Sequence, residues 1–325
     1  MRQRVKHSLT VLLGGFFLLP AGMASAADMA SAADNVSTPF LYTLSNFSGI
    51  LPVSWAGVSI DKSRDEVYVL PGQGVKVFND KGMEVYSFNE AGDIPYIMDV
   101  AVDDEGNIIA ISNDETRIEI IRCNYRGEPV SKMELKNLPP DFSGFSPNRV
   151  FFQKGSFYFA SLGSKQVIIT DREGLFKEGY DIKALLKLDE LEDRNLDDVA
   201  IDGFNIDQEG NILFTMPVMA KAYVLSPDKQ VRSFGTRGSR PGTFGVPSGI
   251  AADASGRFIL VADKLRCVVM VFSKDFKFLT EFGFRGWGPG NLVGPMQLAV
   301  DSKNRVYVTQ LMNRGVSVYQ ITTGG

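Results

Sequence analysis

The stretch VPSGIAADASGRFILVADKLRCVVMVF, at Val246–Phe272, shows the pattern that decides the fold. One short apolar run leads into a polar turn that contains Gly256, a second run ends at Asp263, and a third ends at Phe272. Short apolar runs separated by turns rich in Asp and Gly are typical of antiparallel β-strands. The stretch therefore predicts three short strands in succession.

Six copies of this pattern follow one another along the chain, and most of them continue into a fourth run such as EVYSF, QVRSF or FKFLTEF. Repeats of about 40–50 residues with four short strands each are typical of the blades of a β-propeller. The chain is therefore predicted to be all-β, a six-bladed β-propeller over residues 39–325. The residues that begin the first turn of each copy, 42 to 54 positions apart, are Asp61, Asp103, Gln153, Asp207, Asp253 and Asp301.

The first turn of each copy has a recurring chemistry. An Asp at its start can accept hydrogen bonds from backbone N–H groups two residues on, and Gly106 or Gly210 can then adopt a left-handed conformation. Asn304 can do the same in the last copy, whereas Arg64 occupies this place in the first. The turn of the first copy is therefore expected to differ from the others.

The last copy ends after its third strand, so its fourth strand must come from elsewhere in the chain. The segment PFLYTLSNF, at Pro39–Phe47, resembles the fourth strands of the other copies. We expect this N-terminal strand to pair with the last copy and close the ring, because closure leaves no long exposed strand edge.

Two loop segments 48 residues apart carry a family resemblance: FGTRGSRPGTFGVP at Phe234–Pro247 and FGFRGWGPGNLVGP at Phe282–Pro295. Together with GIAADASGRFILVAD they resemble the NHL repeat. The resemblance is sharp in the last three copies and looser in the first three. It implies a six-bladed propeller that binds partners, and a few relatives, such as the peptide-amidating lyases, are enzymes.

The N-terminal segment has the features of a secretory signal peptide. Three basic residues precede an apolar run of about 11 residues, too short for the about 20 that span a bilayer, and Ala24-Ser25-Ala26 offers a cleavage site. We expect a signal peptide over 1–26, a flexible segment over 27–38, and a location in the periplasm or outside the cell. The repeat MASAAD leaves a second cleavage site, after Ala32.

Composition excludes several classes of function. The formal net charge is -4, which is unfavourable for binding nucleic acid. The only histidine is His7, within the predicted signal peptide, so histidine-based catalysis, histidine-ligated zinc and haem ligation are not expected. Cys123 and Cys267 fall in opposite blades of the predicted ring, so we expect two buried thiols and no disulfide.

One face of the propeller is the predicted site of partner binding. Loops that join blades share this face with loops that join second strands to third strands. Basic residues open the third strands, and they either form a binding collar or pair with neighbouring carboxylates: Lys76, Arg117, Lys165, Lys221, Arg266 and Arg314. The blade-joining loops add Arg237, Arg240, Arg285 and Trp287. Of these, Arg240 and Trp287 are the better candidates, because they differ between the two similar loops.

A polar cluster is predicted at the mouth of the central channel, where the inner strands begin. Its members are Asp99, Asn148, Arg149, Asp202 and Gln297. Calcium-dependent propeller hydrolases use Glu, Asn and Asp at this place, but Arg149 opposes a bound cation. An Asp99–Arg149 pair is the simpler interpretation, and we predict neither a metal nor a cofactor.

The longest interval between copies predicts a short amphipathic helix around Ile182–Leu188, followed by an acidic run. The run lacks the spacing of an EF-hand, which leaves a solvated loop or a metal site as alternatives. Its acidic residues are Asp189, Glu190, Glu192, Asp193, Asp197, Asp198 and Asp202.

These observations favour an exported, monomeric, non-catalytic scaffold that binds a protein or a ligand through one loop face. The expected partner is an envelope or extracellular protein, for example one of an envelope electron-carrier complex. The alternative is a small-molecule hydrolase or lyase that depends on calcium or another metal held by carboxylates at the channel mouth.

Overall fold

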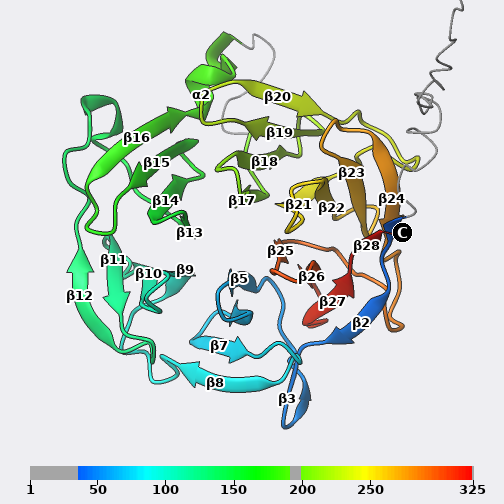
Figure 1. The fold of residues 1–325 in the computed structure, drawn as a ribbon, viewed down its shortest axis with the longest axis horizontal. Helices are drawn as coiled ribbons and strands as arrows, with labels where there is room; N and C mark the ends of the chain where they lie inside the picture. The colour runs from blue at the N-terminus through cyan, green and yellow to red at the C-terminus, as the bar shows by residue number, and fades with distance from the viewer. Residues whose placement is uncertain (1–35, 191–198, 324–325) are drawn as a thin grey trace, which may run out of the picture. The chain divides into compact units, whose positions relative to one another are not determined.

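The computed structural model describes residues 36–190 and 199–323, and these residues form a six-bladed propeller, as predicted. Each blade is a four-stranded antiparallel sheet, and the six sheets surround a central axis (Figure 1). No helix of the described residues is long and apolar enough to cross a membrane.

Blade one is β5 (Gly57–Asp61), β6 (Glu66–Leu70), β7 (Val75–Phe78) and β8 (Glu84–Phe88); blade two is β9 (Ile97–Val102), β10 (Ile108–Asn113), β11 (Ile118–Cys123) and β12 (Pro129–Met133). Blade three is β13 (Arg149–Gln153), β14 (Ser156–Ser161), β15 (Gln166–Thr170) and β16 (Phe176–Asp181); blade four is β17 (Phe204–Ile206), β18 (Ile212–Met216), β19 (Lys221–Leu225) and β20 (Val231–Phe234). Blade five is β21 (Pro247–Ala252), β22 (Phe258–Asp263), β23 (Val268–Ser273) and β24 (Phe278–Phe282); blade six is β25 (Leu298–Val300), β26 (Arg305–Thr309), β27 (Val316–Gln320) and β2 (Phe40–Thr43).

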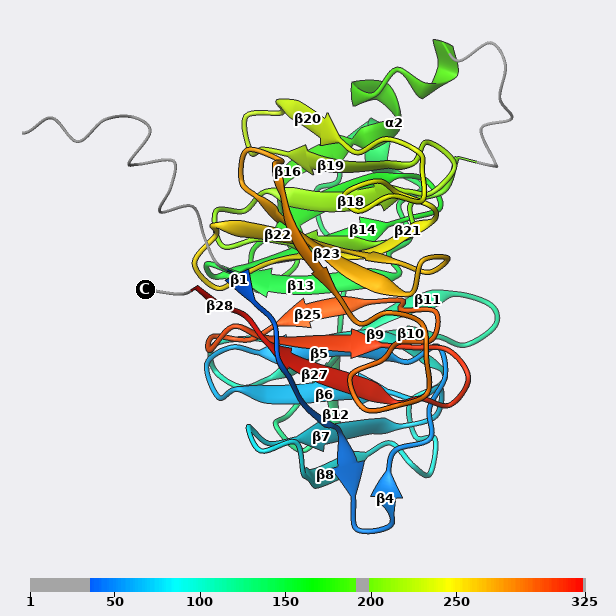
Figure 2. The same ribbon diagram turned by 90° about the vertical axis from the view of Figure 1, so that its right-hand side faces the viewer.

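Blade six is closed by the N-terminal part of the chain, which confirms the predicted closure. The strand β2 pairs antiparallel with β27, with Phe40 opposite Tyr319 and Thr43 opposite Ser317. The pairing strand is shorter than the expected Pro39–Phe47. After it, β3 (Ser45–Asn46) and β4 (Gly49–Ile50) form a small hairpin that projects from the rim (Figures 1 and 2).

The chain ends add a second pairing that the sequence did not predict. Val36–Ser37 form β1, which pairs with β28 (Thr322–Thr323) beside blade six (Figure 2). These two residues fall within the segment 27–38 that was expected to be flexible, and they pair with Thr322 and Thr323. The physical reason is that β1 and β28 run beside each other and satisfy each other's backbone hydrogen bonds.

The predicted turn chemistry is confirmed. The Oδ1 atom of Asp103 accepts hydrogen bonds from the backbone N–H groups of Glu105 (2.9 Å) and Asn107 (2.8 Å), and Gly106 has a φ of 91°. The first copy differs as expected, because Arg64 donates from Nη1 to Asp61 (2.7 Å) and the left-handed residue is instead Asp65, with a φ of 53°.

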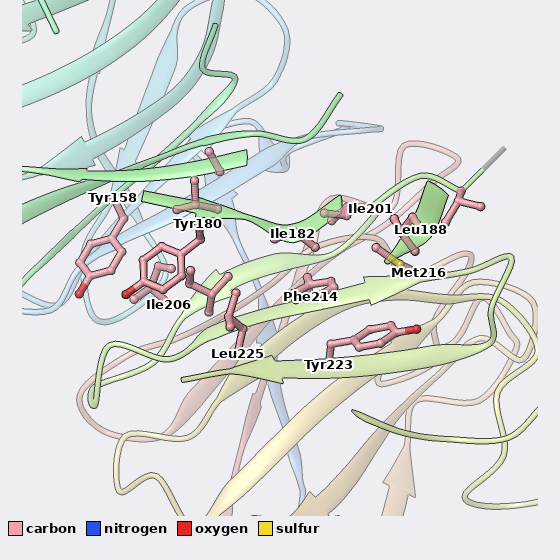
Figure 3. Packing of buried hydrophobic residues seen from close by; sticks show 14 residues of the cluster. Tyr158, Tyr180, Ile182, Leu188, Ile201, Ile206, Phe214, Met216, Tyr223 and Leu225 are labelled. Atoms are coloured by element: carbon pink, nitrogen blue, oxygen red, sulfur yellow. The ribbon is translucent and has the colours of Figure 1, made fainter. Parts of the chain in front are cut away.

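The hydrophobic core is divided among the blade interfaces. Each of six clusters of buried apolar residues contains side chains from two neighbouring blades. Figure 3 shows the cluster between blades three and four, where Tyr158 and Tyr180 of blade three lie beside Ile206 and Leu225 of blade four. The rings of Phe214 and Tyr223 stack at 4.8 Å. Burial on both faces of a blade explains why the middle strands are apolar almost throughout.

The two cysteines are free, as predicted. Cys123 ends β11 in blade two, Cys267 precedes β23 in blade five, and both are buried. Burial raises the pKa of the Cys123 thiol to about 11, so that it stays protonated at neutral pH. Both residues therefore serve as small apolar side chains of the core.

Candidate functional site

The inner strands of all six blades line a central channel with a volume of about 230 Å³. Four of the five predicted channel residues line it: Asp99, Arg149, Asp202 and Gln297. The fifth, Asn148, lines a second hollow at one end of the channel, to which Arg149 and Gln297 also contribute. The structure therefore brings the predicted polar cluster together.

The expected Asp99–Arg149 pair is not formed. Instead, the buried carboxylate of Asp99 accepts a 2.9 Å hydrogen bond from the backbone N–H of Val150. Burial raises the pKa of Asp99 to about 6, and the charge of Arg149 partly opposes this rise. Among the residues that the structure describes, the side chain of Arg149 makes no hydrogen bond or ion pair. Its guanidinium therefore stays available to a bound molecule.

Asp202 and Gln297 have partners that the sequence analysis did not identify. The carboxylate of Asp202 forms an ion pair with the ammonium group of Lys264, which lies on the loop between β22 and β23. The Oε1 atom of Gln297 accepts a hydrogen bond from the backbone N–H of Val58 (3.3 Å), in the next blade. These contacts hold both side chains against neighbouring blades.

The second hollow has a volume of about 270 Å³ and two aromatic residues in its wall, Trp55 and Tyr96. Both are largely exposed, at 69% and 59%. Sequence reasoning missed them, although Trp55 is one of two tryptophans and stands just before the first inner strand. That position corresponds to the blade-joining loops, which would have been the signal. We call this hollow the mouth pocket.

The basic collar divides into paired and unpaired residues. Lys76 pairs with Glu84 (2.9 Å), Arg117 pairs with Glu119 (2.6 Å), and Arg266 pairs with Glu281 (2.7 Å). The side chains of Arg266 and Glu281 are each only 11% exposed, so this pair is largely buried. No ion pair is described for Lys165 or Lys221 within residues 36–190 and 199–323. Lys76, Arg117 and Arg266 therefore pair with neighbouring carboxylates, which is the second of the two alternatives.

Two of the loop arginines have matching structural contacts. Arg237 donates from Nη2 to the backbone carbonyl of Val218 (2.8 Å), and Arg285 donates to that of Leu265 (2.8 Å). Each arginine thus ties a blade-joining loop to the preceding loop between second and third strands. Their equivalence in the two similar loops is explained by this contact.

Arg240, Trp287 and Arg314 lie at the surface in a different way. Trp287 is 65% exposed, and the guanidinium of Arg314 lies 5.4 Å from its ring centre. Arg314 also donates to the carbonyl of Gly288 (3.3 Å). Arg240 is exposed, and its side chain has no partner within residues 36–190 and 199–323. No contact between Arg240 and Trp287 is described there either, so the two residues are separate features of one face.

Hydrogen bonds join neighbouring loops of this face into a continuous arc. Lys264 donates its backbone N–H to Val246 (3.0 Å), Leu311 donates to Val293 (3.1 Å), and Asn313 donates to the hydroxyl of Ser54 (2.6 Å). Large apolar side chains are exposed along the arc and beside it: Trp55, Tyr96, Leu265, Phe284, Trp287 and Met312. We call these six residues the loop-face apolar set.

Three members of this set have unusual backbone conformations. Trp55, Phe284 and Met312 have φ values of 60°, 53° and 59°. Left-handed conformations are rare for bulky residues and cost free energy, so they persist only where surrounding contacts impose them. The arc of hydrogen bonds supplies these contacts and holds the apolar side chains outward.

The predicted helix and acidic run are described in part. A short helix, α2 (Ile182–Leu185), begins with the carboxylate of Asp181 accepting from the N–H of Ala184, and η2 (Leu188–Glu190) follows. In the run, Asp189 pairs with Lys183 (2.9 Å). Glu192, Asp193, Asp197 and Asp198 lie outside the described residues. Within the described residues there is no group of three or more potential metal ligands.

Comparison with known proteins places the fold only. No family model matches the chain, and no curated protein matches it either. A structural genomics protein of unknown function from Bacteroides thetaiotaomicron superposes with a TM-score of 0.61 at 13% identity, covering 89% of this chain and 77% of that one. A streptogramin B lyase gives a TM-score of 0.58 at 11% identity over 89% and 98% of the two chains.

A third structure is a catalytically inactive His-to-Ala variant of virginiamycin B lyase from Staphylococcus aureus, solved with quinupristin. Its TM-score is 0.54 at 12% identity, over 84% of each chain. At such identities the likeness shows a shared propeller fold, which both enzymes and proteins of unknown function adopt.

Proposed function

We propose that this chain is a non-catalytic binding scaffold that engages a protein partner through its loop face. The observation that carries the proposal is the loop-face apolar set: six large apolar side chains exposed on loops that hydrogen bonds fix in place. Exposed aromatic side chains beside arginines are typical of protein interfaces. A surface held in one conformation also loses little entropy when it binds.

The proposal includes the NHL-type loops, export and a monomeric state. The residues that favour NHL type are the Gly-rich loops at 234–247 and 282–295, and their arginines have matching contacts. Export rests on the N-terminal segment alone. The proposed partner is accordingly an envelope or extracellular protein, for example one that works with envelope electron carriers.

The rival function is a metal-dependent hydrolase or lyase in the channel. In the virginiamycin B lyase structure, replacement of a histidine accompanies loss of catalysis. The present chain has only His7, outside the described propeller, and the cation Arg149 lies among the channel carboxylates. A residue with a fixed positive charge disfavours a bound metal ion, which is why the scaffold is the better-supported function.

The experiment compares two pairs of substitutions on opposite faces. The variant Trp287→Ala with Arg240→Ala removes two exposed side chains from the loop face. Its control is Tyr125→Ala with Arg126→Ala, because Arg126 lies 5.4 Å from the ring of Tyr125 on the opposite face, as Arg314 does for Trp287. Partners cross-linked to the exported protein in its native cells are identified by mass spectrometry.

The expected result is that the loop-face variant loses a specific cross-linked partner while the control keeps it, with both melting temperatures within a few degrees of wild type. Equal retention by both variants would move the interface away from these loops. Hydrolysis of lactone or ester substrates that needs added calcium or zinc and disappears in Asp99→Asn or Asp202→Asn would favour the enzyme instead.

A further inference from the structure

The mouth pocket combines aromatic walls with a polar floor. Trp55 and Tyr96 flank it, and Leu70, Pro71, Ile97 and Met98 add apolar surface. Its polar lining includes Asn148, Arg149 and Gln297, which stand where the channel begins. At about 270 Å³ the hollow is somewhat smaller than typical drug-sized sites of about 300–1,000 Å³, so it suits a small ligand.

Several side-chain donors at this floor have no partner among the residues that the structure describes. The Oδ1 atom of Asn148 accepts from the backbone N–H of Leu162 (3.1 Å), and the Oε1 atom of Gln297 accepts from that of Val58 (3.3 Å). Backbone N–H groups can only donate, so the oxygen of each carboxamide must face them and its NH₂ group is directed elsewhere. In the described parts of the chain neither NH₂ group has a partner.

The guanidinium of Arg149 adds up to five further donors, and it too has no described hydrogen bond within residues 36–190 and 199–323. The nearby carboxylate that could neutralise it is that of Asp99, which is buried and accepts from Val150. A cation with two amide donors beside it and no ion pair of its own matches the planar, two-oxygen acceptor of a carboxylate.

We infer that the mouth pocket binds a small carboxylate carried on a ring, with the carboxylate on Arg149, Asn148 and Gln297 and the ring between Trp55 and Tyr96. The two aromatic side chains accept a flat or cyclic body by stacking or edge contact. This site shares Trp55 and Tyr96 with the loop-face apolar set. The variant that tests the proposed protein interface instead changes Arg240 and Trp287, which do not line the pocket. Either proposal can therefore fail without the other.

The test uses the fluorescence of Trp55. The chain has two tryptophans, so Trp287→Phe leaves Trp55 as the single reporter in the wall of the pocket. Benzoate, cyclohexanecarboxylate and glucuronate are titrated at pH 7.5, with the neutral amide benzamide as the isosteric control. Calorimetry on the wild-type chain checks that the reporter substitution leaves these affinities unchanged.

We expect at least one of the three carboxylates to change the emission of Trp55 saturably, and benzamide to bind about tenfold or more weakly than benzoate. Arg149→Gln should remove the response, whereas Arg232→Gln, an exposed arginine of the outer strand β20, should not. A melting curve of each variant confirms folding.

Three results overturn the inference. The first is no saturable response to any of the three carboxylates. The second is equal affinity for benzoate and benzamide, and this comparison does not depend on whether the Arg149→Gln variant folds. The third is unchanged carboxylate affinity in folded Arg149→Gln, because the anion would then bind away from the floor of this pocket.

Discussion

The backbone N–H of Val150 donates a 2.9 Å hydrogen bond to the carboxylate of Asp99, and so joins the inner strands of blades three and two. Burial opposes ionisation of Asp99 more strongly than the charge of Arg149 and the backbone N–H groups of Val150 and Val100 favour it, so the pKa of Asp99 is raised to about 6. The carboxyl of Asp99 therefore links two blades at the channel wall, and its ionised form destabilises the folded chain at neutral pH.

This cost gives the first prediction. The pKa of Asp99 is higher in the folded chain than its ordinary value of 3.8, so its contribution to stability is complete below about pH 4 and is lost as pH rises through about 6. A rise of this size corresponds to about 3 kcal/mol. Asp99→Asn keeps an acceptor for Val150 without the charge.

Urea unfolding of both proteins at pH 4.5 and pH 7.5 measures the effect. The stability of Asp99→Asn relative to wild type should rise between these pH values by about 2 kcal/mol, since other groups titrate alike in both proteins. A relative stability that is the same at both pH values would show that Asp99 is not buried in its charged form.

The second prediction concerns closure of the ring. A Cβ added at Gly82 would lie 2.3 Å from the ring of Tyr42 on the closing strand β2, whereas nothing lies within 4 Å of one added at Gly92. The two glycines have similar φ values of 76° and 81°. Gly92→Ala therefore measures the backbone cost alone, about 1–2 kcal/mol.

Gly82→Ala should cost about 1–3 kcal/mol more than Gly92→Ala, because it also displaces Tyr42. Denaturant unfolding of the two variants gives the difference directly. Equal destabilisation would mean that the closing strand is loosely held against blade one.

The third prediction separates structure from binding in the basic collar. Arg266→Met leaves Glu281 largely buried without its partner and should cost about 3–5 kcal/mol. Adding Glu281→Met removes that unpaired charge and should restore most of the loss. A single variant as stable as wild type would assign Arg266 to contact with a partner instead.

The fourth prediction concerns the thiols. Cys123 and Cys267 are both buried and free, so neither should react with iodoacetamide in the native protein. Mass spectrometry after denaturation without reductant should then show two modified cysteines. A peptide that links the two would contradict the blade assignment.

The ring itself could be predicted because its information is repeated. A period near 48 residues, with an Asp at the start of the first turn in five of the six copies, specifies strands, turns and blade number together. The missing fourth strand of blade six then required a substitute, and Phe40–Thr43 was the available match. The pairing of Val36 with Thr323 could not be predicted in this way, because it lies outside the repeated blades and has no counterpart in the other copies.

The site was predicted only in outline. The beginning of each inner strand fixed where Asp99, Arg149 and Gln297 would lie, since inner strands meet at the channel. The pairing of Asp202 with Lys264 was missed because the partners of loop side chains depend on local geometry, which the sequence repeat does not specify. Trp55 and Tyr96, in contrast, stand just before inner strands, and this position in the blade-joining loops was a signal that the sequence offered.

The pairing of β2 with β27 also determines when blade six can form during synthesis. The ribosome makes residues 40–43 long before residues 316–320, so blade six cannot form until residues 316–320 have been synthesised. A chain that stops short keeps two unpaired strand edges, which recruit other chains and attract proteases. The pairing of β2 with β27 thus distinguishes a chain that includes residues 316–320 from every chain that ends before them.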